Sequence, residues 1–182
     1  MRTSRYIGAG AVLLVLFVVS VVVFPSVRNA IPLPMGLRHV LNIFLNPSDL
    51  YEPIVLDQFQ FDQQGFSKTY LLRPRYLDIY EVGLLNPHGA IPSTYRFSGK
   101  VKLEFLKNHR VIREVVVSTQ GAAVYADKEL TRYRKIALHE FLIPLNGVVE
   151  GLSLRVTVVE PDSGFTALEE KPSLHISVSS RL

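Results

Sequence analysis

The chain has 182 residues, with 20 basic and 16 acidic side chains and no cysteine, so no disulfide holds it together. Three of the basic residues and none of the acidic ones precede residue 31, which leaves 17 basic against 16 acidic residues in the remainder. A nucleic-acid-binding domain needs a concentrated basic face, which this near-neutral remainder does not offer. We therefore expect no nucleic-acid partner, and one folded domain after residue 50.

The first long apolar segment is residues 7–24, IGAGAVLLVLFVVSVVVF, which contains no charged residue and no proline. As a helix rising about 1.5 Å per residue it would be roughly 27 Å long, close to the bilayer hydrocarbon core of about 30 Å. We expect residues 1–6 to be a cytoplasmic tail and residues 7–24 to be an uncleaved transmembrane anchor, or signal-anchor. The alternatives are a cleaved signal peptide, whose apolar core is usually only about 7–15 residues long, and a buried core helix.

The charges beside this segment set its expected orientation. Arg2, Arg5 and the amino terminus precede it, and Arg28 and Arg38 follow it at a distance. The positive-inside bias is therefore weak, but it favours the tail inside and the domain outside. The chain also lacks an N-glycosylation acceptor, because proline occupies the middle of the Asn-Pro-Ser sequence at 46–48. Since a bacterial periplasm suits such a domain, we expect a single-pass protein of the inner (plasma) membrane whose C-terminal domain faces the periplasm or exterior.

Residues 25–50 are expected to form a juxtamembrane linker that includes an amphipathic helix. Its apolar residues recur at the spacing of one helical face: Leu37, Val40, Leu41, Phe44 and Leu45. Polar residues occupy the other side: Arg38, His39 and Asn42. We expect this helix to pack on the following domain through its apolar face. The alternative is a helix that lies on the membrane surface beside the anchor.

After residue 50 the apolar period changes from 3.6 residues to two, which is typical of half-buried strands. The clearest pair is KVKLEFLK at 100–107 and VIREVVVS at 111–118, for which the turn KNHR predicts a hairpin with a four-residue loop. Further strand-like runs occupy five segments: 54–61, 68–85, 135–145, 152–160 and 173–180. These runs predict that residues 51–182 form an antiparallel β-sandwich, immunoglobulin-like or C2-like in topology. Residues 126–135 are expected to be a solvated helical turn or a crossover loop.

The segment 68–85 carries the candidate interaction surface. Pro74 interrupts it, and because proline lacks the N–H of a strand residue, this predicts an edge strand, a bulge or two strands. Two tyrosines share a strand face with Asp78, which indicates that this face is the outer one. Because tyrosine and arginine are enriched at interface hot spots, we predict a partner surface at four residues: Arg73, Arg75, Tyr76 and Tyr80. The alternative is that the tyrosines cover their own sheet.

No motif predicts catalysis, a cofactor or a metal site. The five histidines never lie two or four residues apart, and in HEFLI at 139–143 Ile143 occupies the position of the second zinc ligand of H-E-x-x-H. The chain has no nucleophile elbow G-x-S-x-G, no cysteine for thiol chemistry and no glycine-rich phosphate loop. We therefore expect no enzyme activity, no cofactor and no metal.

The expected function rests on the anchor and the strands, because no stretch resembles a known family closely enough to name one. Confinement to a membrane raises the effective concentration of a domain for partners in the same membrane. We expect a binding or accessory subunit of an envelope complex, or a tethered inhibitor, whose partners are the membrane and an envelope protein. The alternatives are an anchored envelope hydrolase and a β domain that binds a lipid or another ligand.

Overall fold

The computed structural model of the chain describes the following residues: 16, 19–20, 30–31, 33–45, 47–87, 96–118, 123–125, 133–166, 168 and 171–179. The expected tail and most of the expected anchor lie outside this set, so both stay predictions. Within the described residues, no helix is long and apolar enough to cross a bilayer. The chain divides into two compact units, which we call the collar unit (residues 1–50 and 75–77) and the sandwich unit (residues 51–74 and 78–182).

The collar unit contains helix α3, Met35–Leu45, which confirms the expected helix but reverses its expected orientation. Leu37, Val40 and Phe44 have exposed fractions of 55%, 52% and 85%. The polar residues on the opposite side are buried: Arg38, His39 and Asn42. These polar side chains have partners, among them the carbonyl of Ile31, which accepts a hydrogen bond from Arg38 Nη2 at 2.5 Å. The expectation that α3 buries its apolar face is therefore wrong. The helix turns its polar side inward because the polar side chains bond to partners within the protein.

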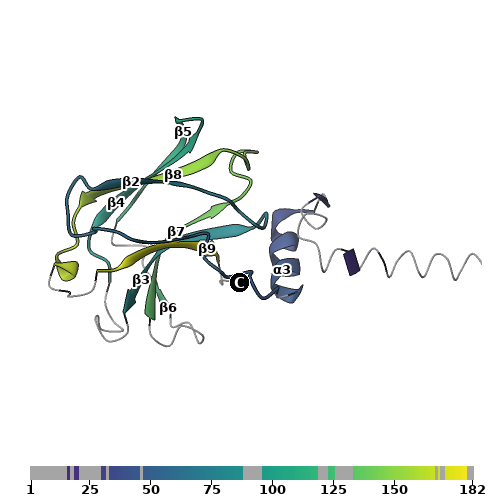
Figure 1. Cartoon of the computed structure of the whole chain (residues 1–182), viewed down its shortest axis with the longest axis horizontal. Helices are drawn as coiled ribbons and strands as arrows, with labels where there is room; N and C mark the ends of the chain where they lie inside the picture. Colours follow the sequence, from purple (N-terminus) through teal and green to yellow (C-terminus); the bar gives the residue numbers. More distant parts are fainter. Residues whose placement is uncertain are drawn as a thin grey trace, which may run out of the picture. The chain divides into compact units, whose positions relative to one another are not determined.

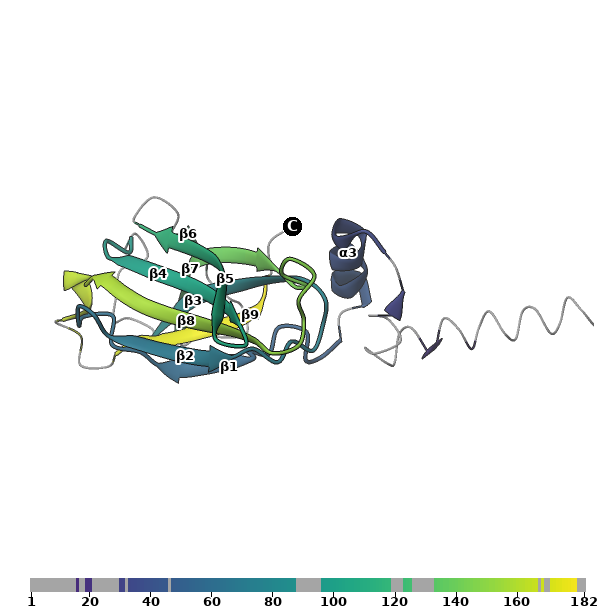
Figure 2. The same ribbon diagram turned by 90° about the horizontal axis from the view of Figure 1, so that it is seen from above.

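The described part of the sandwich unit contains nine strands: β1 Val55–Gln58, β2 Ser67–Leu71, β3 Ile79–Pro87, β4 Lys100–Lys107, β5 Arg110–Val117, β6 Ala123–Tyr125, β7 Tyr133–Leu142, β8 Leu152–Glu160 and β9 Ser173–Val178. A short 3₁₀ helix, η2 Ser163–Phe165, precedes β9. One sheet has the order β1-β9-β3-β7-β6 and the other the order β2-β8-β4-β5. All neighbouring strands are antiparallel. The two sheets form two layers in Figure 1 and lie over one another in Figure 2.

The strand pairs of the sandwich unit are nested along the chain. β1 pairs with β9, β2 with β8, β3 with β7, and β4 with β5, as if one long hairpin were rolled up on itself. This is the arrangement of a double-sheet jelly roll, to which β6 adds a short strand beside β7. The prediction of a mainly β, two-sheet domain is confirmed. The immunoglobulin-like alternative is not observed: the first two strands of an immunoglobulin domain share a sheet, whereas β1 and β2 lie in different sheets.

The core lies between the sheets, because each strand turns alternate residues towards it. In β8 the four inward residues are buried: Leu152, Leu154, Val156 and Val158. Rings from opposite sheets meet there, with the centroids of Phe105 in β4 and Phe141 in β7 4.8 Å apart. Another group of rings packs together: Phe59, Phe61, Phe66, Phe97 and Phe165. Large apolar side chains thus fill much of the interior.

The hairpin of β4 and β5 has a shorter loop than expected. Lys107 pairs with Arg110, so only two residues form the loop in place of the four expected. Both of them, Asn108 and His109, have positive φ angles, 50° and 65°. Two positive φ angles are required by a type I′ turn, whose twist matches that of the flanking strands. The expected loop was too long because this pair lacks the glycine that usually marks such a turn.

Other parts of the sandwich unit differ from the expectations in detail. The interruption at Pro74 is confirmed, since β2 and β3 are separate strands and β2 lies at a sheet edge. Tyr133–Lys135, expected in a helical turn or crossover loop, begins β7, and the rest of that segment, 126–132, lies outside the described residues. β6 was not expected, because three residues are too few to show an alternation of apolar and polar side chains.

Candidate functional site

The four residues of the predicted partner surface do not form one surface. Arg73 is exposed in the segment after β2, but Tyr80 is 1% exposed and its ring packs on Phe141 in the core. The buried carboxylate of Asp78 accepts a hydrogen bond from the backbone N–H of Ile79 at 2.7 Å. Asp78 therefore does not mark an outer face, and the expected exposure of Tyr80 is wrong.

Arg75 and Tyr76 belong to the collar unit and converge on Asp49. The hydroxyl of Tyr76 donates to Asp49 Oδ1 at 2.5 Å, and Arg75 Nη1 lies 3.3 Å from Asp49 Oδ2. Tyr76 is 1% exposed, so its expected exposure is also wrong. Its physical role is to satisfy a carboxylate that follows α3 by four residues. No local pattern in the sequence links residues 49 and 76.

A set of buried polar residues on β3, β7 and β9 was not predicted. We call it the buried polar cluster: Glu81, Lys135, His175 and Ser177, all at most 7% exposed. Lys135 Nζ lies 2.9 Å from Glu81 Oε1, and His175 Nε2 lies 2.9 Å from Ser177 Oγ. In β3, Glu81 alternates with the core residues Tyr80 and Val82, so the cluster lies on the other face of its sheet. The only available signal was a single acidic residue, Glu81, between apolar neighbours in β3.

Gly83 makes room for this cluster. A Cβ atom at this position would lie 3.1 Å from His175 Nδ1 and 2.9 Å from the carbonyl oxygen of Ile136. Contacts this short to backbone exclude a larger side chain without a shift of the strands. The close approach explains why glycine stands in the middle of β3, where it otherwise weakens a strand.

The serine–histidine pair of the cluster is not arranged as a nucleophile with its base. The hydroxyl of Ser177 donates to the carbonyl of Val178 at 3.2 Å, so it accepts its second hydrogen bond from His175 Nε2. A catalytic base would instead accept the serine proton. Burial, and then the nearby Lys135, lowers the pKa of His175 to about 3, so the ring is neutral at pH 7. This geometry gives the hydrolase alternative no support.

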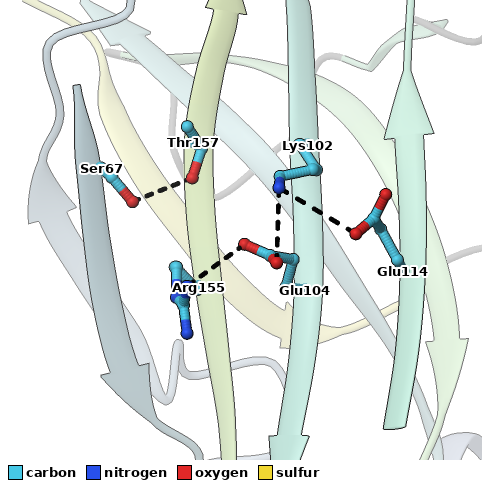
Figure 3. Close-up of polar contacts among 6 residues, drawn as sticks. All are labelled: Ser67, Lys102, Glu104, Glu114, Arg155 and Thr157. Atoms are coloured by element: carbon cyan, nitrogen blue, oxygen red, sulfur yellow. Dashed lines mark hydrogen bonds and ion pairs between the residues drawn. The ribbon is translucent and has the colours of Figure 1, made fainter. Parts of the chain in front are cut away.

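The outer face of the four-stranded sheet carries a ladder of polar pairs, shown in Figure 3. Lys102 Nζ lies 3.3 Å from Glu104 and 4.0 Å from Glu114, and Arg155 lies 3.7 Å from Glu104. The hydroxyls of Ser67 and Thr157 are 2.9 Å apart across β2 and β8. Partly exposed ion pairs of this kind contribute about 0–1 kcal/mol each. The polar side chains of this face therefore already have partners within the sheet. The candidate contact regions that remain on this sheet are its edges.

Strand β5 is the most extended of these edges. It has eight residues and, among the described strands, pairs only with β4. Val111 and Val116 are 47% and 51% exposed. Arg110 and Arg113 are also exposed, and neither takes part in an ion pair with any residue that the structure describes. We call Arg110–Val117 the β5 edge; it combines unused strand pairing, apolar side chains and positive charge.

The part of the chain that the structure describes also contains no group of three or more histidine, aspartate or glutamate side chains able to hold a metal ion. Comparisons of the chain with protein-family models, with curated proteins and with solved structures gave no match. The exposed surfaces of the molecule are therefore the remaining candidates for a functional site. Among these, the β5 edge and the exposed side of α3 depart most from an ordinary polar surface.

Proposed function

We propose that this protein is a membrane-anchored binding protein of a bacterial envelope, whose sandwich unit binds an extended segment of a partner protein at the β5 edge. The single observation that carries the proposal is an eight-residue strand that pairs on one side only among the described strands and that has two exposed valines. Long apolar edge strands are templates for pairing with another chain, and natural proteins usually block or cover them. A partner strand gains affinity from backbone hydrogen bonds and specificity from alternate side chains.

The charges of the β5 edge indicate what kind of segment fits. Arg110 and Arg113 are exposed, whereas Glu114 already lies near Lys102. A partner strand that carries acidic side chains opposite the arginines and apolar side chains opposite Val111 and Val116 therefore complements the edge. Complementary charge also steers association and excludes wrong partners.

The anchor in this proposal is the apolar segment 7–24, with residues 1–6 inside the cell and the sandwich unit in the periplasm. It is supported by the length and composition of the segment and by the positive charge of Arg2, Arg5 and the amino terminus close before it, whereas Arg28 and Arg38 follow at a distance. A tethered domain meets partners in the same membrane at a raised effective concentration, so modest affinity at one strand edge is sufficient. A subunit of an envelope complex and a tethered inhibitor both fit this arrangement.

Lysine substitutions test the β5 edge. In the full chain purified from membranes, Val111→Lys and Val116→Lys are expected to reduce the yield of co-purifying partner at least tenfold. The reason is that a lysine on a free edge blocks strand addition while leaving the fold intact. The matched control is Leu56→Lys, because Leu56 is 59% exposed on β1, an edge strand of the other sheet. Hydrogen exchange of the β5 amides should slow in the complex.

The proposal fails if partner is retained by both β5 variants while their melting temperatures match that of the natural chain. It also fails if Leu56→Lys removes the partner to the same extent, because the loss would then not be specific to β5.

A further inference from the structure

We propose that α3 lies in the surface of a lipid bilayer, with Leu37, Val40 and Phe44 inserted among the lipids. The inference rests on the membrane anchoring proposed above and assigns a second membrane contact, formed by the collar unit. In this second contact, the three side chains touch lipid directly, beside the point where the apolar segment 7–24 leaves the membrane.

The exposed side of α3 has the composition of an interfacial helix. Leu37, Val40 and Phe44 follow one another at three and four residues, so they form one stripe along a helix about 16 Å long. More than half of each side chain is exposed, and Phe44 is almost fully exposed. A single exposed apolar residue is ordinary on a protein surface, but a stripe of three on one helix marks a contact with protein or membrane, and such a stripe is what an interfacial helix buries among lipids.

The collar unit holds this stripe outward. Arg38 and Asn42, on the opposite side, are 5% and 0% exposed, and Arg38 donates to the carbonyl of Ile31. After the helix, Asp49 is held by the hydroxyl of Tyr76. Turning α3 to bury its apolar side would break the bond to Ile31 and bring the polar side chains out. The outward direction of the stripe is therefore built into the unit.

The length of the intervening chain favours lipid as the occupant of the stripe. Ten residues, 25–34, separate the apolar segment from α3, and at about 3.3–3.6 Å per residue they reach at most about 35 Å. A helix on so short a connection stays near the bilayer surface in every copy of the protein and at every concentration. Lipid is therefore the partner that the stripe meets first, ahead of a second copy of the chain.

The helix makes this contact without exposed charge. Its only basic or titratable side chains are Arg38 and His39, and both are about 5% exposed. Attraction to anionic headgroups needs exposed Lys or Arg, so insertion of α3 depends on apolar contact alone. The depth of insertion should be the same in neutral and in anionic bilayers.

The experiment uses the absence of native cysteine. Phe44→Cys and, as a matched control, Leu71→Cys on β2, which is 51% exposed, are labelled with an environment-sensitive fluorophore in the full chain. Each is reconstituted into phosphatidylcholine vesicles, with and without phosphatidylglycerol. Emission is then quenched either by spin-labelled lipid or by iodide in the water. We expect spin-labelled lipid to quench position 44 by more than half, and equally in both lipids, whereas iodide quenches only position 71.

Three outcomes contradict the inference. Equal iodide quenching at positions 44 and 71 means that the stripe faces water. Protection of position 44 from both quenchers means that protein covers it, as in a dimer. Lipid quenching that appears only with phosphatidylglycerol means that charge drives the contact. Flotation of the vesicles after an alkaline wash separates these failures from failure of the anchor itself, because a chain that does not float with the vesicles was never anchored.

Discussion

Replacing Lys135 with methionine is expected to lower the free energy of unfolding by about 3–5 kcal/mol, because removal of one partner from a buried ion pair leaves the other charge uncompensated. Glu81 is 1% exposed and its Oε1 lies 2.9 Å from Lys135 Nζ, so the change removes a cation that lies beside a buried carboxylate. Methionine preserves the length of the side chain and removes only its charge. Urea unfolding of the full chain in mild detergent at pH 7, followed by circular dichroism, measures the loss.

Two variants make this result specific. Lys102→Met removes a lysine from a partly exposed site beside Glu104, and it should cost about 1 kcal/mol or less. The double variant Glu81→Leu, Lys135→Met removes both buried charges and should restore most of the loss, since an apolar pair avoids the desolvation cost. A single variant as stable as the natural chain, or a double variant as unstable as the single one, contradicts the account of this cluster.

The second large effect is a loss of stability as the pH falls from about 6.5 to about 3. The pKa of His175 is about 3 in the folded chain, lowered first by burial and then by Lys135. In the unfolded chain it returns to about 6.5, so between these values the unfolded state binds one proton that the folded state does not. The stabilising contribution of neutral His175 is complete above pH 6.5 and decreases by about 1.4 kcal/mol per pH unit below it. By pH 3 the accumulated loss is on the order of 4 kcal/mol.

The test compares unfolding free energies across this range for the natural chain and for His175→Gln, whose side-chain amide still reaches Ser177. The variant should remove the slope that belongs to His175, while slopes from other groups remain in both proteins. His109→Gln, at an exposed position in the turn between β4 and β5, is the matched control for the loss of a histidine side chain. Parallel curves for the natural chain and His175→Gln would show that His175 is not the buried neutral group described.

Local pattern predicted the strands of the sandwich unit well. β4 and β8 begin and end at the residues predicted from the alternation of apolar side chains, and α3 falls on the predicted helix. These features depend on neighbouring residues, which one sequence displays directly. The order of the strands does not depend on neighbouring residues, because the pairing of β1 with β9 joins segments more than a hundred residues apart. The two-residue turn was missed for a local reason, since Asn108-His109 contains no glycine.

The direction in which side chains point was predicted less well than the elements themselves. Periodicity shows which residues share a face, but the face that becomes buried depends on partners elsewhere in the chain. Asp49 binds Tyr76, and Phe141 packs on Tyr80, so neither tyrosine is exposed. Arg38 and its polar neighbours bury the side of α3 that composition assigns to water. The buried polar cluster was missed for the same reason, because its members come from three strands.

Protease accessibility of a C-terminally tagged full chain tests the central claim, an anchored protein with its sandwich unit outside the cell, most directly. The digestion is run on right-side-out and inverted membrane vesicles, and band sizes are compared with a full-length standard. We expect the undigested chain to be full length and to stay with the membrane, and protease to remove the tag only from the outer face. Digestion only from the inner face, or a shorter product free of the membrane, would contradict the claim.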